Sequence, residues 1–172
     1  MLFKICMLAV IVIASVALGN VIVSGAGDRI RTLVQLVNCV KAMKNGMIYQ
    51  GMTLFEALAY GDKVGLSGFL LECAQILKKN PELSGKQIVK QAMEKENRQV
   101  SHLKGQEREA FLELMDRLSG AVVREQIEEA TGVFFREMNS LIRELSEEQA
   151  KKSKLIKTMC LLSGLAVAII LV

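Results

Sequence analysis

The most constraining feature of this 172-residue chain is the distribution of its charges. Apart from Lys4, every Lys, Arg, Asp and Glu lies between Asp28 and Lys157. Residues 5–27 and 158–172 therefore form two uninterrupted runs without charge. A charged domain between two apolar ends predicts a membrane-associated protein, and it argues against a freely soluble enzyme, a disordered chain or a multi-span transporter.

The first apolar run, residues 5–27, is long enough to cross a membrane as a helix. It would reach about 34 Å at about 1.5 Å per residue, against a hydrocarbon core about 30 Å thick. A cleaved signal peptide is the competing interpretation, because Ser24, Gly25 and Ala26 offer small residues at a cleavage position. A single preceding lysine and the length of the run favour an uncleaved transmembrane helix.

The last apolar run, residues 158–172, would reach only about 22 Å as a helix. Lys154 and Lys157 can extend their ammonium groups to the membrane surface and so lengthen the crossing. An apolar tail buried in a soluble partner is the alternative. Two apolar runs around one charged domain favour a short transmembrane helix.

The flanking charges predict the orientation in the cell membrane. Six basic residues flank the runs on the domain side, whereas only Lys4 and the amino terminus lie on the other; the six are Arg29, Arg31, Lys151, Lys152, Lys154 and Lys157. The positive-inside rule then places the domain, residues 28–157, in the cytoplasm and both termini outside. The four lysines are also candidates for contact with anionic membrane lipid. A topology signal alone would explain them too.

Between the two runs, the apolar spacing predicts an all-α fold. No stretch alternates with period two for long enough to indicate a strand. Apolar residues three and four apart predict a first helix ending near Tyr49, followed by four shorter ones. These cover about 54–61 and 66–79, a segment opened by Ser84 and Gln87, and a segment closed near Gly120. Asn97 to Ser101 is predicted to be a break.

The last helix is predicted to be the longest and to run into the second membrane span. Its apolar residues step by three and four and form a narrow seam, typical of a helix hairpin or coiled coil: Val123, Ile127, Ala130, Phe134, Met138, Leu141 and Leu145. Gly132 interrupts this pattern, which a close helix crossing would explain. The first and last helices must meet the same membrane face. We therefore expect a helical bundle built on an antiparallel pair of long helices, flanked by N- and C-terminal transmembrane helices.

A turn after the first helix supplies the candidate interaction residues. Gly51 can adopt the left-handed conformation that ends many helices. Thr53 and Glu56 match the capping box, in which each side chain accepts a backbone N–H of the other residue. Ala57 and Leu58 continue the helix that this box opens. We expect capping to be the main role of Thr53 and Glu56, with direct partner contact as the alternative.

No pattern of residues predicts catalysis, a cofactor or a metal site. His102 is the only histidine, and the four cysteines form no CxxC pair. Ser84-Gly85-Lys86 resembles the end of a phosphate-binding loop, but Asn80 stands where its first glycine should be. The carboxylates of the fifth helix are expected on a solvated face, with Glu113 and Arg117 paired; they are Glu107, Glu109, Glu113 and Asp116. Because acidic and basic residues alternate throughout, we expect no nucleic-acid binding.

The segment from Tyr49 to Leu58, YQGMTLFEAL, resembles the turn-and-helix signature of the stage III sporulation protein AB family. The chain length, both apolar runs, Gly105-Gln106 and Arg124-Glu125-Gln126 fit the same family. The resemblance therefore covers essentially the whole chain. Leu54 stands where the family usually has proline, which is helpful at a first helical position but not required.

The family is similar to the cytoplasmic helical domain of the inner-membrane platform proteins of type II secretion and type IV pilus systems. The resemblance implies a mother-cell membrane component of the channel complex that links mother cell and forespore, with a scaffold role and no catalysis. Its implied partners are other channel components, including a secretion-type ATPase. Self-association of the helical domain is a further expectation. The residues alone leave open a membrane-anchored coiled-coil signalling or adaptor protein, paired in parallel through the seam.

Overall fold

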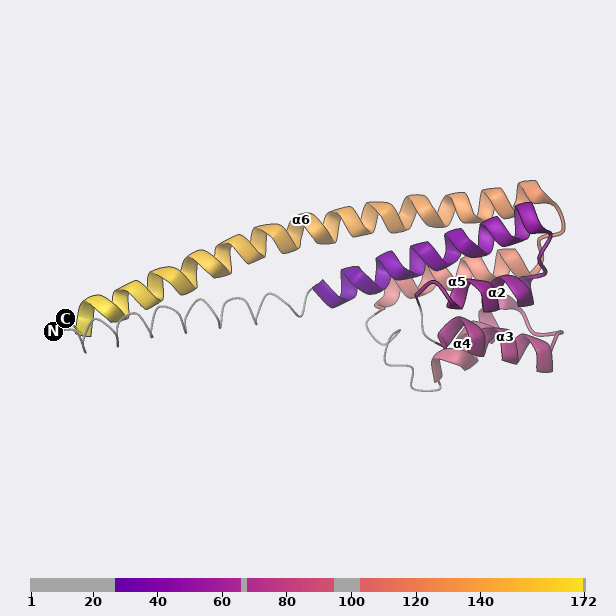
Figure 1. The fold of residues 1–172 in the computed structure, drawn as a ribbon, viewed down its shortest axis with the longest axis horizontal. Helices are drawn as coiled ribbons and strands as arrows, with labels where there is room; N and C mark the ends of the chain where they lie inside the picture. Colours follow the sequence, from indigo (N-terminus) through magenta and orange to yellow (C-terminus); the bar gives the residue numbers. More distant parts are fainter. Residues whose placement is uncertain (1–26, 66–67, 95–102, 172) are drawn as a thin grey trace. The chain divides into compact units, whose positions relative to one another are not determined.

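A computed structural model describes residues 27–65, 68–94 and 103–171, all of whose regular elements are helices. A first helix covers residues 27–50. The others are α2 (Leu54–Asp62), α3 (Phe69–Lys79), α4 (Gly85–Glu94), α5 (Gly105–Ser119) and α6 (Arg124–Leu171) (Figure 1). The all-α prediction is confirmed. The predicted break at Asn97 to Ser101, His102 and nearly all of the predicted N-terminal span lie outside the described residues.

The chain divides into two compact units, residues 29–142 and residues 1–28 with 143–172. Within the first unit, the 27–50 helix and the beginning of α6 lie side by side in opposite directions (Figure 1). The guanidinium of Arg124, at the start of α6, lies 5.5 Å from the ring centre of Tyr49, at the end of the first helix. One turn further along α6, the pKa of Glu128 is lowered by its hydrogen bond with Arg124 and, to a smaller extent, by the positive charge of Lys44 in the first helix. This is the antiparallel arrangement that the sequence predicts.

Three phenylalanines from three helices form the centre of the core. Phe69 of α3, Phe111 of α5 and Phe134 of α6 are almost completely buried. Their ring centres are 6.1 Å apart for Phe69 and Phe111, and 6.3 Å apart for Phe111 and Phe134. Burying one large apolar side chain stabilises a fold by about 1.5–3 kcal/mol, so this cluster is a main contribution to holding α3, α5 and α6 together.

The seam of α6 packs inside the chain over most of its predicted length. Ile127, Ala130, Phe134, Met138 and Leu141 are all buried. The prediction that Val123 begins the seam is wrong. Val123 precedes the first residue of α6, and its side chain is 48% exposed. The prediction of a close helix crossing at Gly132 is also wrong, because a Cβ atom built there would meet nothing within 4 Å among the described residues. No close helix crossing accounts for this glycine.

Side chains fix the starts of three helices. Both predicted capping boxes are present, since Thr53 pairs with Glu56 and Ser84 pairs with Gln87. The start of α3 uses a side chain from the preceding helix. The carboxylate of Asp62 accepts the backbone N–H groups of Gly68 at 3.0 Å, Leu70 at 3.1 Å and Leu71 at 3.3 Å. Helix α3 therefore begins at Phe69 and not at residue 66.

The prediction that all four carboxylates of α5 lie on a solvated face is wrong for Glu107. Its side chain is completely buried and is bound by both Nε and Nη2 of Arg29, with the Nε bond at 2.7 Å. The backbone N–H of Lys104 donates to the same carboxylate at 3.0 Å. Glu107 lies on the face of α5 that also buries Ala110, Phe111 and Leu114. Its carboxylate is therefore a core group, and the ion pair with Arg29 compensates its charge.

In the second unit, α6 continues without interruption to Leu171, as predicted for a helix that runs into the last apolar segment. Arg143 pairs with Glu147 at 3.0 Å, and Lys152 pairs with Glu148 at 3.1 Å. None of the helices in the described part of the chain combines the length and the apolar character that a membrane crossing needs. The crossing by residues 158–172 therefore stays a prediction.

Candidate partner-binding surfaces

The predicted turn forms at the end of the 27–50 helix. Gly51 has a φ of 64°, the left-handed conformation expected of it. The N–H of Met52 then donates to the carbonyl of Gly46 at 3.1 Å and closes the turn. The next residue, Thr53, is extended and caps α2. The turn is thus fixed on both sides, by the helix before it and the cap after it.

The capping box holds Glu56 as a carboxylate on the surface. The N–H of Thr53 donates to Glu56 Oε2 at 2.8 Å, and the N–H of Glu56 donates to Thr53 Oγ1 at 3.3 Å. These bonds, the backbone one first, lower the pKa of Glu56 below its ordinary value. Both oxygens remain near solvent, so capping does not prevent Glu56 from meeting a partner.

The five candidate residues of this segment divide into two groups. Gly51, Thr53 and Glu56 are exposed, whereas Ala57 and Leu58 are completely buried. Ala57 and Leu58 therefore attach α2 to the core, and only the first three lie where a partner could touch them. This segment carries its own cation–π contact, in which Lys78 Nζ lies 5.8 Å from the ring centre of Phe55.

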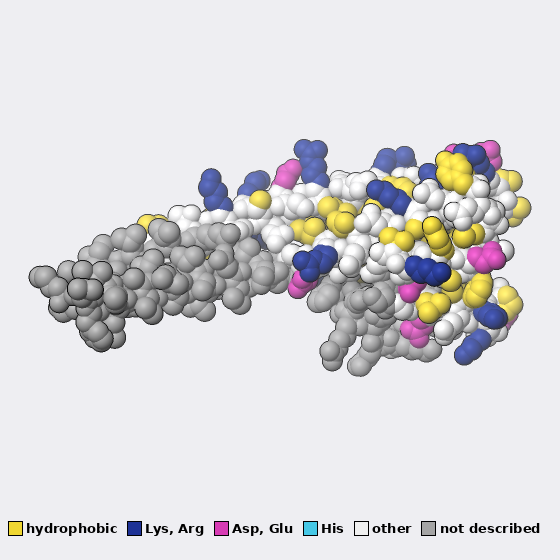
Figure 2. Space-filling model, viewed as in Figure 1, with side chains coloured by type: hydrophobic (Ala, Val, Ile, Leu, Met, Phe, Trp, Pro, Cys, Tyr) yellow, Lys and Arg dark blue, Asp and Glu magenta, His cyan; other side chains and the backbone are white. Residues whose placement is uncertain are grey.

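Exposed apolar side chains occur next to the turn, and the sequence did not single them out. Tyr49 is 72% exposed and Val122 is 89% exposed. Tyr49 and the α5–α6 loop are connected through Arg124, whose guanidinium covers the tyrosine ring and whose Nε donates to Glu128 at 2.8 Å. On the face in Figure 2, apolar, basic and acidic side chains are interspersed over the 27–50 helix, α2 and α3, without a field of one sign.

The predicted membrane-surface lysines lie in the second unit. Lys151, Lys152 and Lys154 are exposed on α6, and Lys157 lies in the same helix, with its side chain outside the described part. Leu155, Met159 and Leu162 follow at spacings of four and three, each about 60% exposed. Lysines followed by an exposed apolar stripe are typical of a helix that enters a membrane surface.

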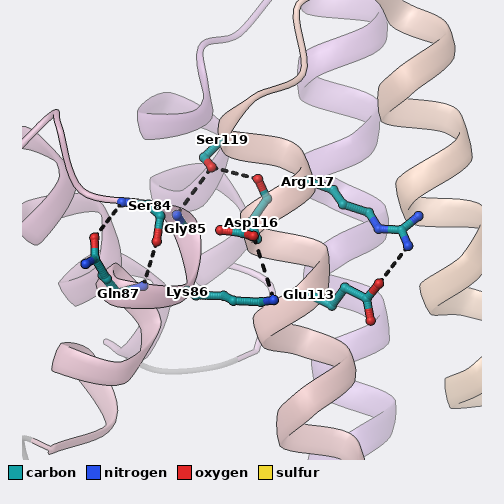
Figure 3. Close-up of polar contacts among 8 residues, drawn as sticks. All are labelled: Ser84, Gly85, Lys86, Gln87, Glu113, Asp116, Arg117 and Ser119. Carbon is teal, nitrogen blue, oxygen red and sulfur yellow. Dashed lines mark hydrogen bonds and ion pairs between the residues drawn. The ribbon is translucent and has the colours of Figure 1, made fainter.

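A polar junction joins α4 to α5 (Figure 3). Gly85 approaches α5 so closely that a Cβ atom built on it would lie 2.0 Å from the carbonyl oxygen of Met115. The N–H of Gly85 donates to Ser119 Oγ at 3.3 Å, and Lys86 Nζ lies 3.8 Å from Asp116. Packing therefore explains the glycine of Ser84-Gly85-Lys86, which on sequence alone resembled part of a phosphate-binding loop.

A groove runs between α5 and α6 on the other side of α5. Figure 3 shows the pair of Glu113 and Arg117, joined at 2.6 Å, on the side of α5 away from α4. One end of the groove is a cleft of about 390 Å³, lined by Asp116, Arg117, Gly120, Ala121, Gln126, Glu129 and Ala130. A smaller and narrower part continues along Ala110, Glu113, Leu114, Val133, Phe134 and Glu137. We call this surface the α5–α6 groove.

Cys39 and Cys73 are buried cysteines, and burial raises the pKa of the Cys73 thiol to about 12. Within residues 27–65, 68–94 and 103–171, no three His, Cys, Asp or Glu side chains are placed to hold a metal ion. The turn, the lysines of α6 and the α5–α6 groove are the candidate surfaces for contact with proteins or lipid.

Comparison with known protein families identifies a match over nearly the whole chain. A family model described as stage III sporulation protein AB matches residues 4–172, which include both apolar runs and the whole charged domain. The searches of curated proteins and of solved structures found no match.

Proposed function

Because the chain belongs to the stage III sporulation protein AB family and so has a role in endospore formation, we propose that it is a membrane-anchored scaffold of the channel between mother cell and forespore. In this proposal it performs no catalysis. Its helical domain lies in the mother-cell cytoplasm and binds other channel components, including a secretion-type ATPase. The observation that carries the proposal is the family match over residues 4–172.

The arrangement of the helices supports anchoring at both ends. The first helix and the first part of α6 run antiparallel in the unit of residues 29–142, so the start of the first helix and the part of α6 near residue 142 lie at the same end of this unit. Each leads to an apolar run, 5–27 or 158–172. We propose that both runs cross the membrane. The exposed lysines at 151, 152 and 154 would then face anionic lipid at the cytoplasmic surface.

Reporter fusions test this topology. Alkaline phosphatase fused after Val172 should be active, because the enzyme folds only outside the cytoplasm. A fluorescent protein that matures only in the cytoplasm should stay dark at the same position. A fluorescent fusion together with an inactive phosphatase would contradict the two-span arrangement.

A parallel coiled-coil adaptor is the alternative, and burial of the seam counts against it. The seam residues from Ile127 to Leu141 already pack within one chain. A parallel dimer through the same residues would have to open the core around Phe134. Single cysteines at the exposed positions Glu129 and Ser140, in a chain without Cys6 and Cys160, test this directly. Residue-to-self cross-links at both positions would favour the adaptor, and their absence is the expected result.

A further inference from the structure

We propose that the α5–α6 groove is a docking site for a positively charged amphipathic helix of a protein partner. The inference deepens the scaffold proposal by assigning one surface and one partner chemistry to it. It rests on that proposal only in requiring that the domain binds proteins. The occupant is recognised by its shape and charge.

The shape of the groove suits a helix. Its floor carries short side chains, Ala110, Ala130 and Ala121, together with Gly120, so backbone and side chains of a partner can approach closely. The cleft at one end of the groove has a volume of about 390 Å³ and opens to solvent. Helix-in-groove recognition uses such a surface, with apolar anchors at helical spacing.

The charge of the groove differs from that of the chain. The chain as a whole carries 22 basic and 18 acidic residues, a net charge of +4. The side chains that line the groove include four acidic ones, Glu113, Asp116, Glu129 and Glu137, and one basic one, Arg117, a net charge of −3. A local negative surface on a positive chain favours a positively charged partner, because complementary potentials steer association and disfavour wrong partners.

The carboxylates along α6 indicate how such a helix would be held. Glu129, Val133 and Glu137 follow one another at spacings of four, so they share one edge of the groove. Within the part of the chain that the structure describes, neither Glu129 nor Glu137 has an ion-pair partner. On the opposite edge, Arg117 is already bound by Glu113 at 2.6 Å and leaves little net positive charge. Two carboxylates eight residues apart are separated by about 12 Å, which matches lysines or arginines two turns apart on a docked helix.

The experiment measures binding of a synthetic peptide to the full chain in nanodiscs of zwitterionic lipid, with empty nanodiscs as the blank. The probe is a fluorescent helix of Leu, Ala and Lys, with lysines every fourth residue on one side; a second probe has Glu in place of Lys. The chain should bind the lysine probe and not the glutamate probe. Binding should weaken as salt is raised, because salt screens exposed charges.

Matched charge reversals locate the binding. Glu129→Lys with Glu137→Lys should weaken binding of the lysine probe by about tenfold or more, because two attractions become repulsions. Glu109→Lys with Glu125→Lys changes the net charge equally, at exposed positions that do not line the groove, and should change binding by less than about threefold. Glu129→Gln with Glu137→Gln should lie between them, and retained helix content by circular dichroism checks folding of all variants.

Three results would overturn the inference: no binding of the lysine probe to the unmodified chain, equal weakening in both reversed pairs, or a change of oligomeric state in Glu129→Lys with Glu137→Lys without any peptide. The last result would make the groove a contact between copies. None of these outcomes bears on recovery of channel components from cells, so failure of this inference is distinguishable from failure of the scaffold proposal.

Discussion

Replacing Gly85 with alanine should force α4 away from α5. The added Cβ atom would lie 2.0 Å from the carbonyl oxygen of Met115, 2.2 Å from its carbonyl carbon and 2.6 Å from the nitrogen of Asp116. Ordinary contacts of a Cβ atom begin near 3.4 Å. All three atoms belong to the backbone of α5, so no side-chain rotation can relieve the clash. One helix must move by more than about 1 Å, which overpacked cores tolerate poorly.

The expected cost follows from the contacts that this movement breaks. Overpacking a core costs about 1–3 kcal/mol. Loss of the hydrogen bond from Gly85 N–H to Ser119 Oγ adds about 0.5–1.5 kcal/mol. The better helix propensity of alanine returns up to about 1 kcal/mol. We expect the free energy of unfolding to fall by about 2–3 kcal/mol, a large part of the 5–15 kcal/mol available to a typical fold.

Thermal unfolding of the full-length chain in detergent micelles, followed by circular dichroism, measures this effect. Gly85→Ala should lower the Tm by about 4–12 °C, at about 2–4 °C per kcal/mol. Gly132→Ala is the matched control, because the same change meets open space there. It should leave the Tm unchanged or raise it by a few degrees. Equal Tm values for the Gly85→Ala and Gly132→Ala variants would refute the close contact between α4 and α5.

Three further predictions concern charges, a cap and a buried thiol. Glu107→Leu should lower the free energy of unfolding by about 3 kcal/mol, because it leaves the guanidinium of Arg29 unpaired, and adding Arg29→Leu should recover part of the loss in thermal melts. Glu56→Ala should weaken the cap on α2 by about 1 kcal/mol; unchanged stability with loss of a partner in pull-downs would instead indicate direct contact. Cys73 should stay protonated in the folded chain up to a pH of about 12, whereas its pKa in the unfolded chain is near the ordinary 9.0. The unfolded state therefore loses its proton first, so stability should fall as the pH rises above about 9, and Cys73→Ala should reduce this dependence in urea titrations.

Local patterns in the sequence account for the parts of the fold that could be predicted. A capping box needs two residues three positions apart, so Thr53 with Glu56 and Ser84 with Gln87 are readable without any tertiary information. The left-handed turn at Gly51 can be predicted because few other residues adopt this conformation at low cost. The seam of α6 is readable because a helix repeats every 3.6 residues. Each of these features is fixed by neighbours within one or two turns.

The features that the sequence missed depend on contacts between distant segments. Glu107 looks like a surface acid until the fold brings it to Arg29, 78 residues away. Gly85 looks like part of a loop motif until α5 is placed against it. The groove likewise needs the relative positions of α5 and α6, because neither helix alone shows that Glu129 and Arg117 line one cleft. Periodicity identifies a face of a helix, but it does not say which face of which other helix covers it.

The scaffold proposal is tested most directly by what the full-length chain retains in sporulating cells. The chain, tagged at its C-terminus, would be purified in mild detergent from membranes of sporulating cells, and the retained proteins would be quantified by mass spectrometry. A single-span membrane protein with the same tag, expressed at the same level, is the control. We expect a secretion-type ATPase and other channel components to be enriched over this control. Recovery of the intact chain with none of them enriched would contradict the account.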